Sequence, residues 1–226
     1  MKKSKGEKNM FSFGRCFILG DSYSTFKGFI PEGYATWYSE EKKPETDVVS
    51  VEQTWWYDLT GKHGATLVRN CSYSGTTICH TGYDGEDYKE ISFLGRMETL
   101  LNEGFFEENP VDTIFIFGGT NDSWAQSPVG ELCTQDWTEE SLYSVLPAFC
   151  KLLDLITTRL PGVRVICPIN TELDPAISSG LLAGCAWYGA LAVILWDIGK
   201  TAGHPNKMGM RQIRDQIIQT VENIGF

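Results

Sequence analysis

Five short apolar runs recur along the chain, and each predicts a buried β-strand. Their residues are apolar almost without interruption instead of alternating with polar ones, which is typical of strands covered on both faces. The runs are Arg15–Leu19, Ala65–Asn70, Thr113–Phe117, Arg164–Ile169 and Ala192–Trp196.

Segments between these runs carry apolar residues three or four positions apart and predict helices. Ser50 and Gln53 resemble a capping box that opens a helix over Val51–Thr60, with Gly61 as its stop. Pro147 interrupts the longest pattern and could kink that helix. The other patterns are Leu94 with Met97, Leu100 and Leu101, the run from Leu142 to Ile156, about Pro175–Tyr188, and Lys207–Ile224.

Strands that alternate with helices indicate βαβ units, parallel strands and right-handed crossovers. We therefore predict an α/β fold, a three-layer α/β/α sandwich formed by a single domain over residues 15–226. Residues 1–14 are expected to be an N-terminal tail that is flexible or vector-derived. The long irregular connection over residues 23–50 is rich in aromatic residues. These either shape a binding site or pack the loop onto the domain, two readings of equal weight.

Charge and hydropathy exclude some partners. The formal net charge of −10 argues against nucleic acid or an anionic membrane as the main partner. No apolar run approaches the length of a membrane span. The basic start Met1-Lys2-Lys3 is followed by polar residues where a signal peptide would be apolar. We expect a cytoplasmic protein, or a secreted or periplasmic one if a signal was removed.

The seven cysteines are expected to be buried free thiols in a reducing compartment. A metal site at Cys71, Cys79 and His80 is the alternative, but this spacing matches no common ligand pattern. We therefore predict no metal site.

Three polar segments follow predicted strands at or near their carboxyl ends, which is where α/β sheets bind ligands. They are Gly20-Asp21-Ser22, Gly118–Asp122 and His204-Pro205-Asn206. A serine, an asparagine and a histidine that converge there would supply a nucleophile, an oxyanion donor and a base. These are the parts that an acyl-transfer enzyme needs.

The order of four motif blocks resembles that of the SGNH hydrolases, the GDSL-type esterases and lipases, over nearly the whole chain. The blocks are Gly20-Asp21-Ser22, Asn70–Gly75, Gly119–Asp122 and His204-Pro205. The resemblance implies a flavodoxin-like five-stranded sheet of strand order 2-1-3-4-5. It also implies that Ser22 is the nucleophile, that His204 is the base, and that Ser22, Gly75 and Asn121 form the oxyanion hole.

One position departs from the family pattern. The family usually has an aspartate three residues before the histidine, and Thr201 stands there in this chain. Asp197 could orient His204 if the loop folds back. Alternatively, a backbone carbonyl near Thr201 orients the ring and gives a Ser–His dyad, which is the reading we favour.

Each of these residues alone also fits an ordinary structural role. Ser22 could be a helix N-cap, Asn121 a turn residue and His204 a surface residue. Their joint placement at strand ends favours the site. Trp124 and His80 are candidates to line its pocket.

We therefore predict a serine esterase for short acyl esters, such as acetyl groups, on carbohydrate or small molecules. No metal or organic cofactor, nucleic acid or membrane is expected as a partner, and the oligomeric state is left open. The rival readings are an acyltransferase on the same fold and a catalytically inactive carbohydrate-binding relative.

Overall fold

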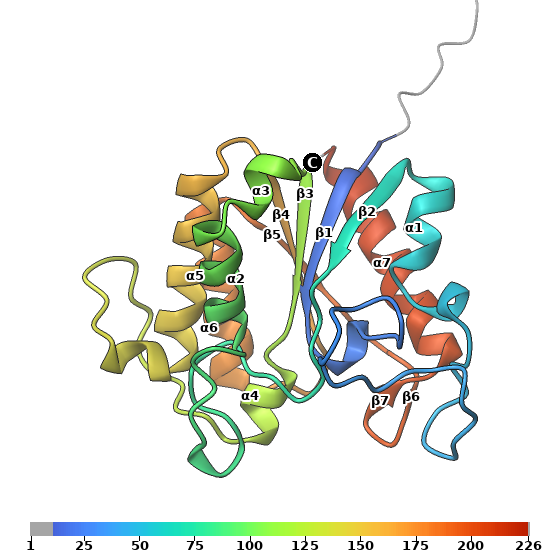
Figure 1. The fold of residues 1–226 in the computed structure, drawn as a ribbon, viewed down its shortest axis with the longest axis horizontal. Helices are drawn as coiled ribbons and strands as arrows, with labels where there is room; N and C mark the ends of the chain where they lie inside the picture. The colour runs from blue at the N-terminus through green and yellow to red at the C-terminus, as the bar shows by residue number, and fades with distance from the viewer. Residues whose placement is uncertain (1–10, 226) are drawn as a thin grey trace, which may run out of the picture.

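A parallel sheet of five strands separates two layers of helices (Figure 1). The computed structural model describes residues 11–225 and, within them, only the backbone of residues 60–62. The strands are β1 Gly14–Gly20, β2 Ala65–Asn70, β3 Thr113–Phe117, β4 Arg164–Ile169 and β5 Leu191–Ile194. Their order is β2-β1-β3-β4-β5 and every pair is parallel, which confirms the predicted fold class and strand order.

The bounds of β1 and β5 differ from the prediction, since β1 ends at Gly20, one residue late, and β5 begins at Leu191, one residue early. β5 ends at Ile194, two residues early, because the backbone of Trp196 bonds to the side-chain amide of Gln216 instead of to the sheet. At the other end of the chain, Phe13 is fully buried and β1 begins at Gly14. The ordered domain therefore begins before Arg15. The first ten residues of the expected tail lie outside the described residues.

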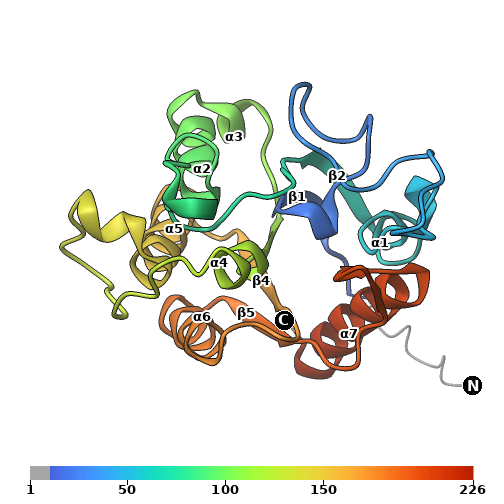
Figure 2. The ribbon, with the colours of Figure 1, turned by 90° about the horizontal axis from the view of Figure 1, so that it is seen from below.

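Helices cover both faces of the sheet, as Figures 1 and 2 show. One face carries α2 Phe93–Asn102, α3 Phe105–Glu108, α5 Val145–Arg159 and α6 Pro175–Tyr188, and the other carries α1 Tyr57–Lys62 and α7 Lys207–Ile224. The short helix α4 Thr120–Trp124 lies at the carboxyl ends of the strands. None of the helices in the described part of the chain is long and apolar enough to cross a membrane.

The two cores explain why the strands read as continuous apolar runs. In β1, Phe17 and Leu19 join the core against α2, α5 and α6, whereas Cys16 and Ile18 join the core against α1 and α7. Successive side chains of a strand point to opposite faces, so a strand with a core on each side is apolar at every position.

The helix predicted over Val51–Thr60 is broken. Val51–Gln53 is one 3₁₀ turn, and α1 begins at Tyr57 and runs past Gly61 to Lys62. The indole nitrogens of Trp55 and Trp56 both donate to Ser24, to its hydroxyl at 3.1 Å and its carbonyl at 2.9 Å. Thr54 separates the two helical segments, because its backbone is extended, with φ of −75° and ψ of 153°.

Pro147 does not kink its helix. α5 begins at Val145, so Pro147 lies in the first turn, where its missing N–H has no partner to lose. Leu142, the first residue of the predicted pattern, belongs to a separate 3₁₀ turn over Glu140–Tyr143.

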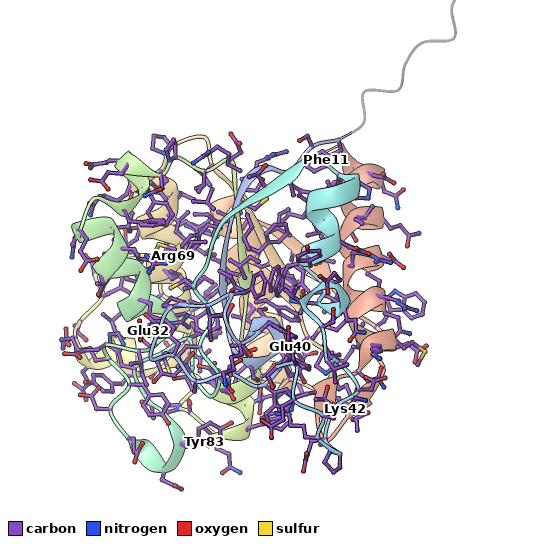
Figure 3. The ribbon with its side chains drawn as sticks, turned by 45° about the vertical axis from the view of Figure 1, so that its right-hand side comes forward. Phe11, Glu32, Glu40, Lys42, Arg69 and Tyr83 are labelled. Carbon is purple, nitrogen blue, oxygen red and sulfur yellow. The ribbon has the colours of Figure 1, made fainter. Side chains whose placement is uncertain are left out.

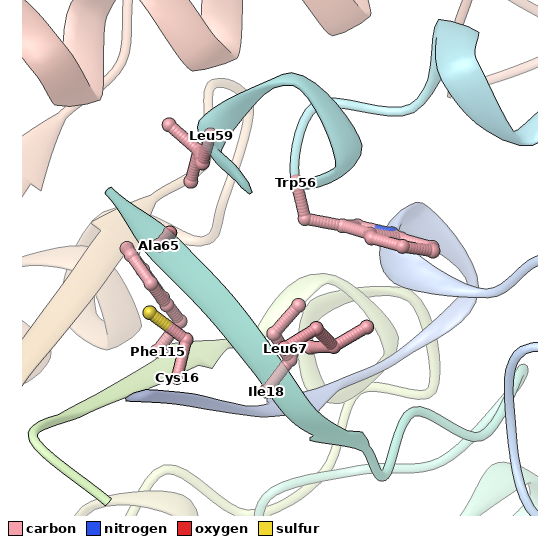
Figure 4. A pocket seen from close by; sticks show the side chains of 7 residues that line it. All are labelled: Cys16, Ile18, Trp56, Leu59, Ala65, Leu67 and Phe115. Atoms are coloured by element: carbon pink, nitrogen blue, oxygen red, sulfur yellow. The ribbon is translucent and has the colours of Figure 1, made fainter. Parts of the chain in front are cut away.

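A small apolar pocket lies between α1 and the sheet (Figure 4). It is lined by Cys16, Ile18, Trp56, Leu59, Ala65, Leu67 and Phe115. Burial raises the pKa of the Cys16 thiol to about 12, so this side chain stays protonated and behaves as an apolar group. We interpret the pocket as imperfect packing. All seven cysteines are free and all but Cys133 are buried, as the sequence predicts.

Candidate active site

Ser22 begins a tight turn directly after β1. The turn is a 3₁₀ helix over Ser22–Ser24, and Asp21 caps it by accepting a hydrogen bond from the Tyr23 amide at 3.0 Å. Asp21 thus has the structural role expected of it. The turn fixes Ser22 at the carboxyl end of β1, which is the second strand in the spatial order of the sheet.

A two-residue hairpin carries His204 to this turn. Strands β6 Lys200–Thr201 and β7 His204–Pro205 are antiparallel, and Ala202 and Gly203 connect them with φ of 47° and 75°. Positive φ at both central residues is typical of a type I′ turn. The hairpin places Nε2 of His204 2.9 Å from Oγ of Ser22.

The other ring nitrogen of His204 faces the backbone. Its Nδ1 lies 3.1 Å from the carbonyl oxygen of Ala202. Asp197 is exposed, and among residues 11–225 the Ala202 carbonyl is the hydrogen-bond partner of this nitrogen. No hydrogen bond joins Asp197 to His204 in the described part of the chain, so the structure does not support Asp197 as the residue that orients the ring.

Aromatic rings surround the imidazole. Trp37 stacks on it with ring centroids 3.6 Å apart and planes 7° apart. Tyr23 and Trp124 pack at centroid distances of 5.4 and 5.7 Å. Trp124 is 45% exposed, so the structure brings this predicted pocket residue to the site with part of its surface open to solvent.

Two tyrosine hydroxyls hold the hairpin. Tyr23 donates to the carbonyl of Gly203 at 2.6 Å, and Tyr38 donates to the carbonyl of Pro205 at 2.7 Å. Both tyrosines are fully buried. The long loop therefore packs onto the domain and shapes the site at once, so both readings of its aromatic residues hold.

The environment of His204 favours the neutral ring. Burial is the main cause that lowers its pKa to about 4. The hydrogen bond to Ala202 opposes this shift, and the cations of Lys43 and Lys200 add to it. The imidazole is therefore free to accept a proton at neutral and mildly acidic pH.

Gly75 and Asn121, the predicted oxyanion donors, each have an N–H group that is left for a ligand. Gly75 has φ of 85°, open space where a Cβ would stand, and an amide without a hydrogen-bond partner among residues 11–225. The side-chain amide of Asn121 donates to the carbonyl of Thr76 at 2.9 Å and accepts from the hydroxyl of Tyr83 at 2.8 Å. One N–H of Asn121 is then left for a ligand.

Tyr83 was not predicted from the sequence. It lies on a 3₁₀ turn at the end of the molecule opposite Phe11 (Figure 3). Its hydroxyl fixes which end of the Asn121 amide is the donor. No spacing or motif connects it with Asn121, which is 38 positions away.

A buried arginine braces the loop that carries Gly75. Arg96 is 3% exposed and donates to the carbonyls of Gly20 and Cys71 and to the hydroxyl of Thr76. It thereby joins the end of β1 to the Gly75 loop. Its position next to an apolar helical face gave no sign of this role.

Asp122 anchors the far end of the same loop. Its carboxylate accepts from the amides of Ile78 at 2.9 and 3.0 Å and of Cys79 at 3.3 Å. The Gly75 loop is thus held at both ends by buried polar side chains.

His80 does not line the pocket, contrary to the prediction. It is fully buried, its Nδ1 lies 3.0 Å from the hydroxyl of Ser92, and its ring packs edge-on against Tyr143. It follows the Gly75 block in sequence, but the chain has turned into the core by this point. Within residues 11–225, no group of three or more His, Cys, Asp or Glu side chains is arranged to hold a metal ion.

Comparison with known proteins agrees with this geometry. A family model described as "GDSL-like Lipase/Acylhydrolase" matches residues 15–221. No curated protein matches the chain.

Two solved structures are similar in sequence and fold. A protein of Bacteroides uniformis ATCC 8492, described as a GDSL-like lipase, is 42% identical over 93% of this chain and 96% of that one, with a TM-score of 0.86. One of Bacteroides ovatus ATCC 8483, with the same description, is 39% identical over 94% and 99%, with a TM-score of 0.85.

A more distant structure shares the fold alone. Est24, a carbohydrate acetylesterase of Sinorhizobium meliloti, is 15% identical over 93% of this chain and 99% of that one, with a TM-score of 0.61.

Proposed function

Because the chain belongs to the family of GDSL-like lipases and acylhydrolases, we propose that it is a serine esterase that cleaves carboxylic esters through an acyl-enzyme on Ser22. The observation that carries this proposal is the 2.9 Å contact between Oγ of Ser22 and Nε2 of His204. An unactivated serine hydroxyl is a poor nucleophile, and a neutral imidazole within hydrogen-bond reach activates it.

The reaction proceeds in two steps. Nε2 of His204 accepts the Ser22 proton while Oγ attacks the ester carbonyl, and the same proton then passes to the leaving alcohol. Water, deprotonated by His204, attacks the acyl-enzyme and releases the carboxylic acid and Ser22. This chemistry requires neither a metal nor an organic cofactor.

The negative charge that develops on the carbonyl oxygen is held by fixed donors. These are the amides of Ser22 and Gly75 and the free N–H of Asn121. Donors that are already in place need no reorganisation during the reaction, and the loss of one typically costs about 2.7–4 kcal/mol. Arg96 and Asp122 support this arrangement by holding the Gly75 loop.

The base is oriented by a main-chain carbonyl instead of a carboxylate. The hydrogen bond to Ala202 keeps a proton on Nδ1, so that Nε2 is the acceptor. We therefore place this protein among Ser–His dyad enzymes.

Short acyl esters on carbohydrate or small molecules are the proposed substrates. Trp124 supports this choice because it lies beside His204 with 45% of its surface exposed, and an indole face suits stacking on a sugar ring. A structural neighbour described as a carbohydrate acetylesterase shares the fold.

Hydrolysis of p-nitrophenyl acetate and labelling by a fluorophosphonate probe test the proposal. Ser22→Ala is expected to lower kcat by about 10³-fold or more and to abolish labelling, because the nucleophile is lost. Ser39→Ala, in the neighbouring loop, is the control and is expected to retain both. Activity that survives in Ser22→Ala would show that another residue is the nucleophile.

Two further outcomes separate the rival functions. If the native protein does not hydrolyse p-nitrophenyl acetate and is not labelled by the fluorophosphonate probe, yet binds acetylated sugars, it is an inactive carbohydrate-binding relative. An added acceptor alcohol that takes most of the acyl group in place of water would identify an acyltransferase.

A further inference from the structure

His204 lacks the support that a carboxylate would give it. Its one hydrogen bond on Nδ1 goes to the uncharged carbonyl of Ala202 at 3.1 Å. A single such bond permits the ring to rock about it, and it supplies no negative charge when the imidazole becomes imidazolium. The long loop places Trp37 where it can meet both needs.

Trp37 covers one whole face of the imidazole. The two rings are nearly parallel, at a centroid distance of 3.6 Å and an angle of 7°. A flat ring in van der Waals contact prevents rotation out of the plane that contains both hydrogen bonds of His204. The indole face is also electron-rich and attracts a cation, so it favours imidazolium over imidazole.

Trp37 is itself fixed relative to Ser22. Its amide donates to Oγ1 of Thr25 at 2.9 Å, and that hydroxyl donates to the carbonyl of Ser22 at 3.0 Å. Lys43 also packs on the indole, with Nζ 4.3 Å from the ring centroid, and donates a hydrogen bond to the Trp37 carbonyl. The Thr25 hydroxyl therefore links the backbone of Trp37 to the backbone of Ser22 through two hydrogen bonds.

The stability of the fold does not explain this tryptophan. Its indole N–H is buried without a hydrogen-bond partner among residues 11–225. A buried unpaired donor destabilises the folded state, and a phenylalanine would cover His204 without it.

We propose that Trp37 is a positioning residue that holds the plane of His204 and stabilises its protonated form in the transition state. The proposal rests on the serine esterase function proposed above. It predicts that the aromatic face, and not the indole N–H or the bulk of the side chain, is what the reaction requires.

Three variants test it: Trp37→Leu, Trp37→Phe and the control Phe29→Leu. Phe29 lies in the same loop but packs on Trp56, 6.1 Å between centroids, instead of on His204. Trp37→Leu is expected to lower kcat for p-nitrophenyl acetate by about 10- to 30-fold with KM within about threefold. Trp37→Phe and Phe29→Leu are expected to keep kcat within about threefold of the native value.

Fluorophosphonate labelling separates this role from substrate binding, because the small probe needs the Ser22–His204 pair and little of the pocket. Trp37→Leu should label about 10-fold more slowly than the native protein, at a temperature where circular dichroism shows it folded. Native labelling rates in Trp37→Leu, with a raised KM, would overturn the proposal and make Trp37 a substrate contact.

The remaining outcomes are also decisive. Equal loss of kcat in the Leu and Phe variants would overturn the role of the aromatic face. A native kcat in Trp37→Leu would overturn the whole inference while leaving the esterase function intact. Absence of hydrolysis and labelling in the native protein would instead reject the proposed function, and this inference with it.

Discussion

His204 combines a charge-free partner on Nδ1 with a crowded, apolar surrounding. The apolar surrounding favours the neutral ring, and so do the two lysines whose cations lie near it, whereas the hydrogen bond to the uncharged carbonyl opposes them only in part. An enzyme with a carboxylate at this position would hold its histidine closer to the ordinary pKa or above it. The difference should be visible in the pH dependence of the reaction.

The activity, measured as kcat/KM, should persist at mildly acidic pH. Because burial lowers the pKa of His204 to about 4, the neutral form persists well below pH 6, and kcat/KM for p-nitrophenyl acetate should be near its plateau at pH 5.5. Steady-state rates between pH 4 and 8 measure it. Lys43→Gln should move the rise to higher pH, since one cation is removed. A rise centred at pH 6.5 or above would contradict the prediction.

Motif residues could be placed from the sequence because strand ends meet at one edge of a parallel sheet. Ser22 and Asn121 follow strands of the sheet, and His204 lies on a hairpin after the last strand that brings it to Ser22. Asp197 and His80 were misplaced because nearness in sequence does not give the direction in which a loop turns. Trp37, Tyr23 and Arg96 act across long sequence separations, and no periodic pattern indicates such contacts.

At the scale of elements, the hairpin β6–β7 decides the position of the base. It was not predicted, since its strands have only two residues each and its turn lacks the usual Asn-Gly pair. Ala202 adopts φ of 47° there, a conformation that costs about 1–2 kcal/mol for a residue with a Cβ. Its carbonyl is the partner of His204, so this strained residue serves the site.

A residue that adopts the left-handed conformation more easily than Ala202 should stabilise the fold. Ala202→Asn is expected to raise the free energy of unfolding by about 0.5–1 kcal/mol, because Asn tolerates the left-handed conformation better than Ala. The activity should change less than about twofold, since the main-chain carbonyl remains. Urea denaturation and the ester assay measure the two effects.

Gly203→Ala is the matched opposite of this change. A Cβ at Gly203 would lie 3.2 Å from the Trp124 ring and would require φ of 75°. Both stability and activity should fall. If Ala202→Asn lost activity at unchanged stability, the hairpin would have changed its backbone conformation.

Helices were predicted best where sequence signals sit at their ends. α6 and α7 have the predicted bounds, and Asp174 and Asn206 cap their first turns. The break before α1 at the extended Thr54 could not be foreseen, because no Gly or Pro marks it and the two indoles that follow bind Ser24 in another segment. Tertiary contacts of this kind override local propensity.

At the scale of the whole molecule, three buried ionisable groups lie near the carboxyl ends of the strands, next to the site. Asp21 and Asp122 are almost fully buried, as is Arg96, and none of them forms an ion pair within residues 11–225. Asp21 and Asp122 accept from backbone amides, and Arg96 donates to two backbone carbonyls and to the Thr76 hydroxyl. The site is therefore held in place at some cost in stability, and that cost should depend on pH.

Burial raises the pKa of Asp21 from 3.8 to about 7. Between these values the folded protein binds more protons than the unfolded chain, so this group destabilises the fold as the pH rises toward 7. Asp21→Asn removes the effect and keeps an oxygen to accept from the Tyr23 amide. The free energy of unfolding of Asp21→Asn minus that of the native protein should thus be larger at pH 8 than at pH 5 by about 1–3 kcal/mol.

Urea denaturation of both proteins at the two pH values measures this difference. The lowered pKa of His204 acts in the opposite direction, because the folded protein then binds fewer protons than the unfolded chain between about pH 4 and 6.5. That contribution is common to both proteins and cancels.

Asp136→Asn, at an exposed carboxylate, is the control and should give the same difference at both pH values. A pH-independent difference for Asp21→Asn as well would mean that Asp21 stays charged in the folded protein, held by the Tyr23 amide and the nearby Arg96.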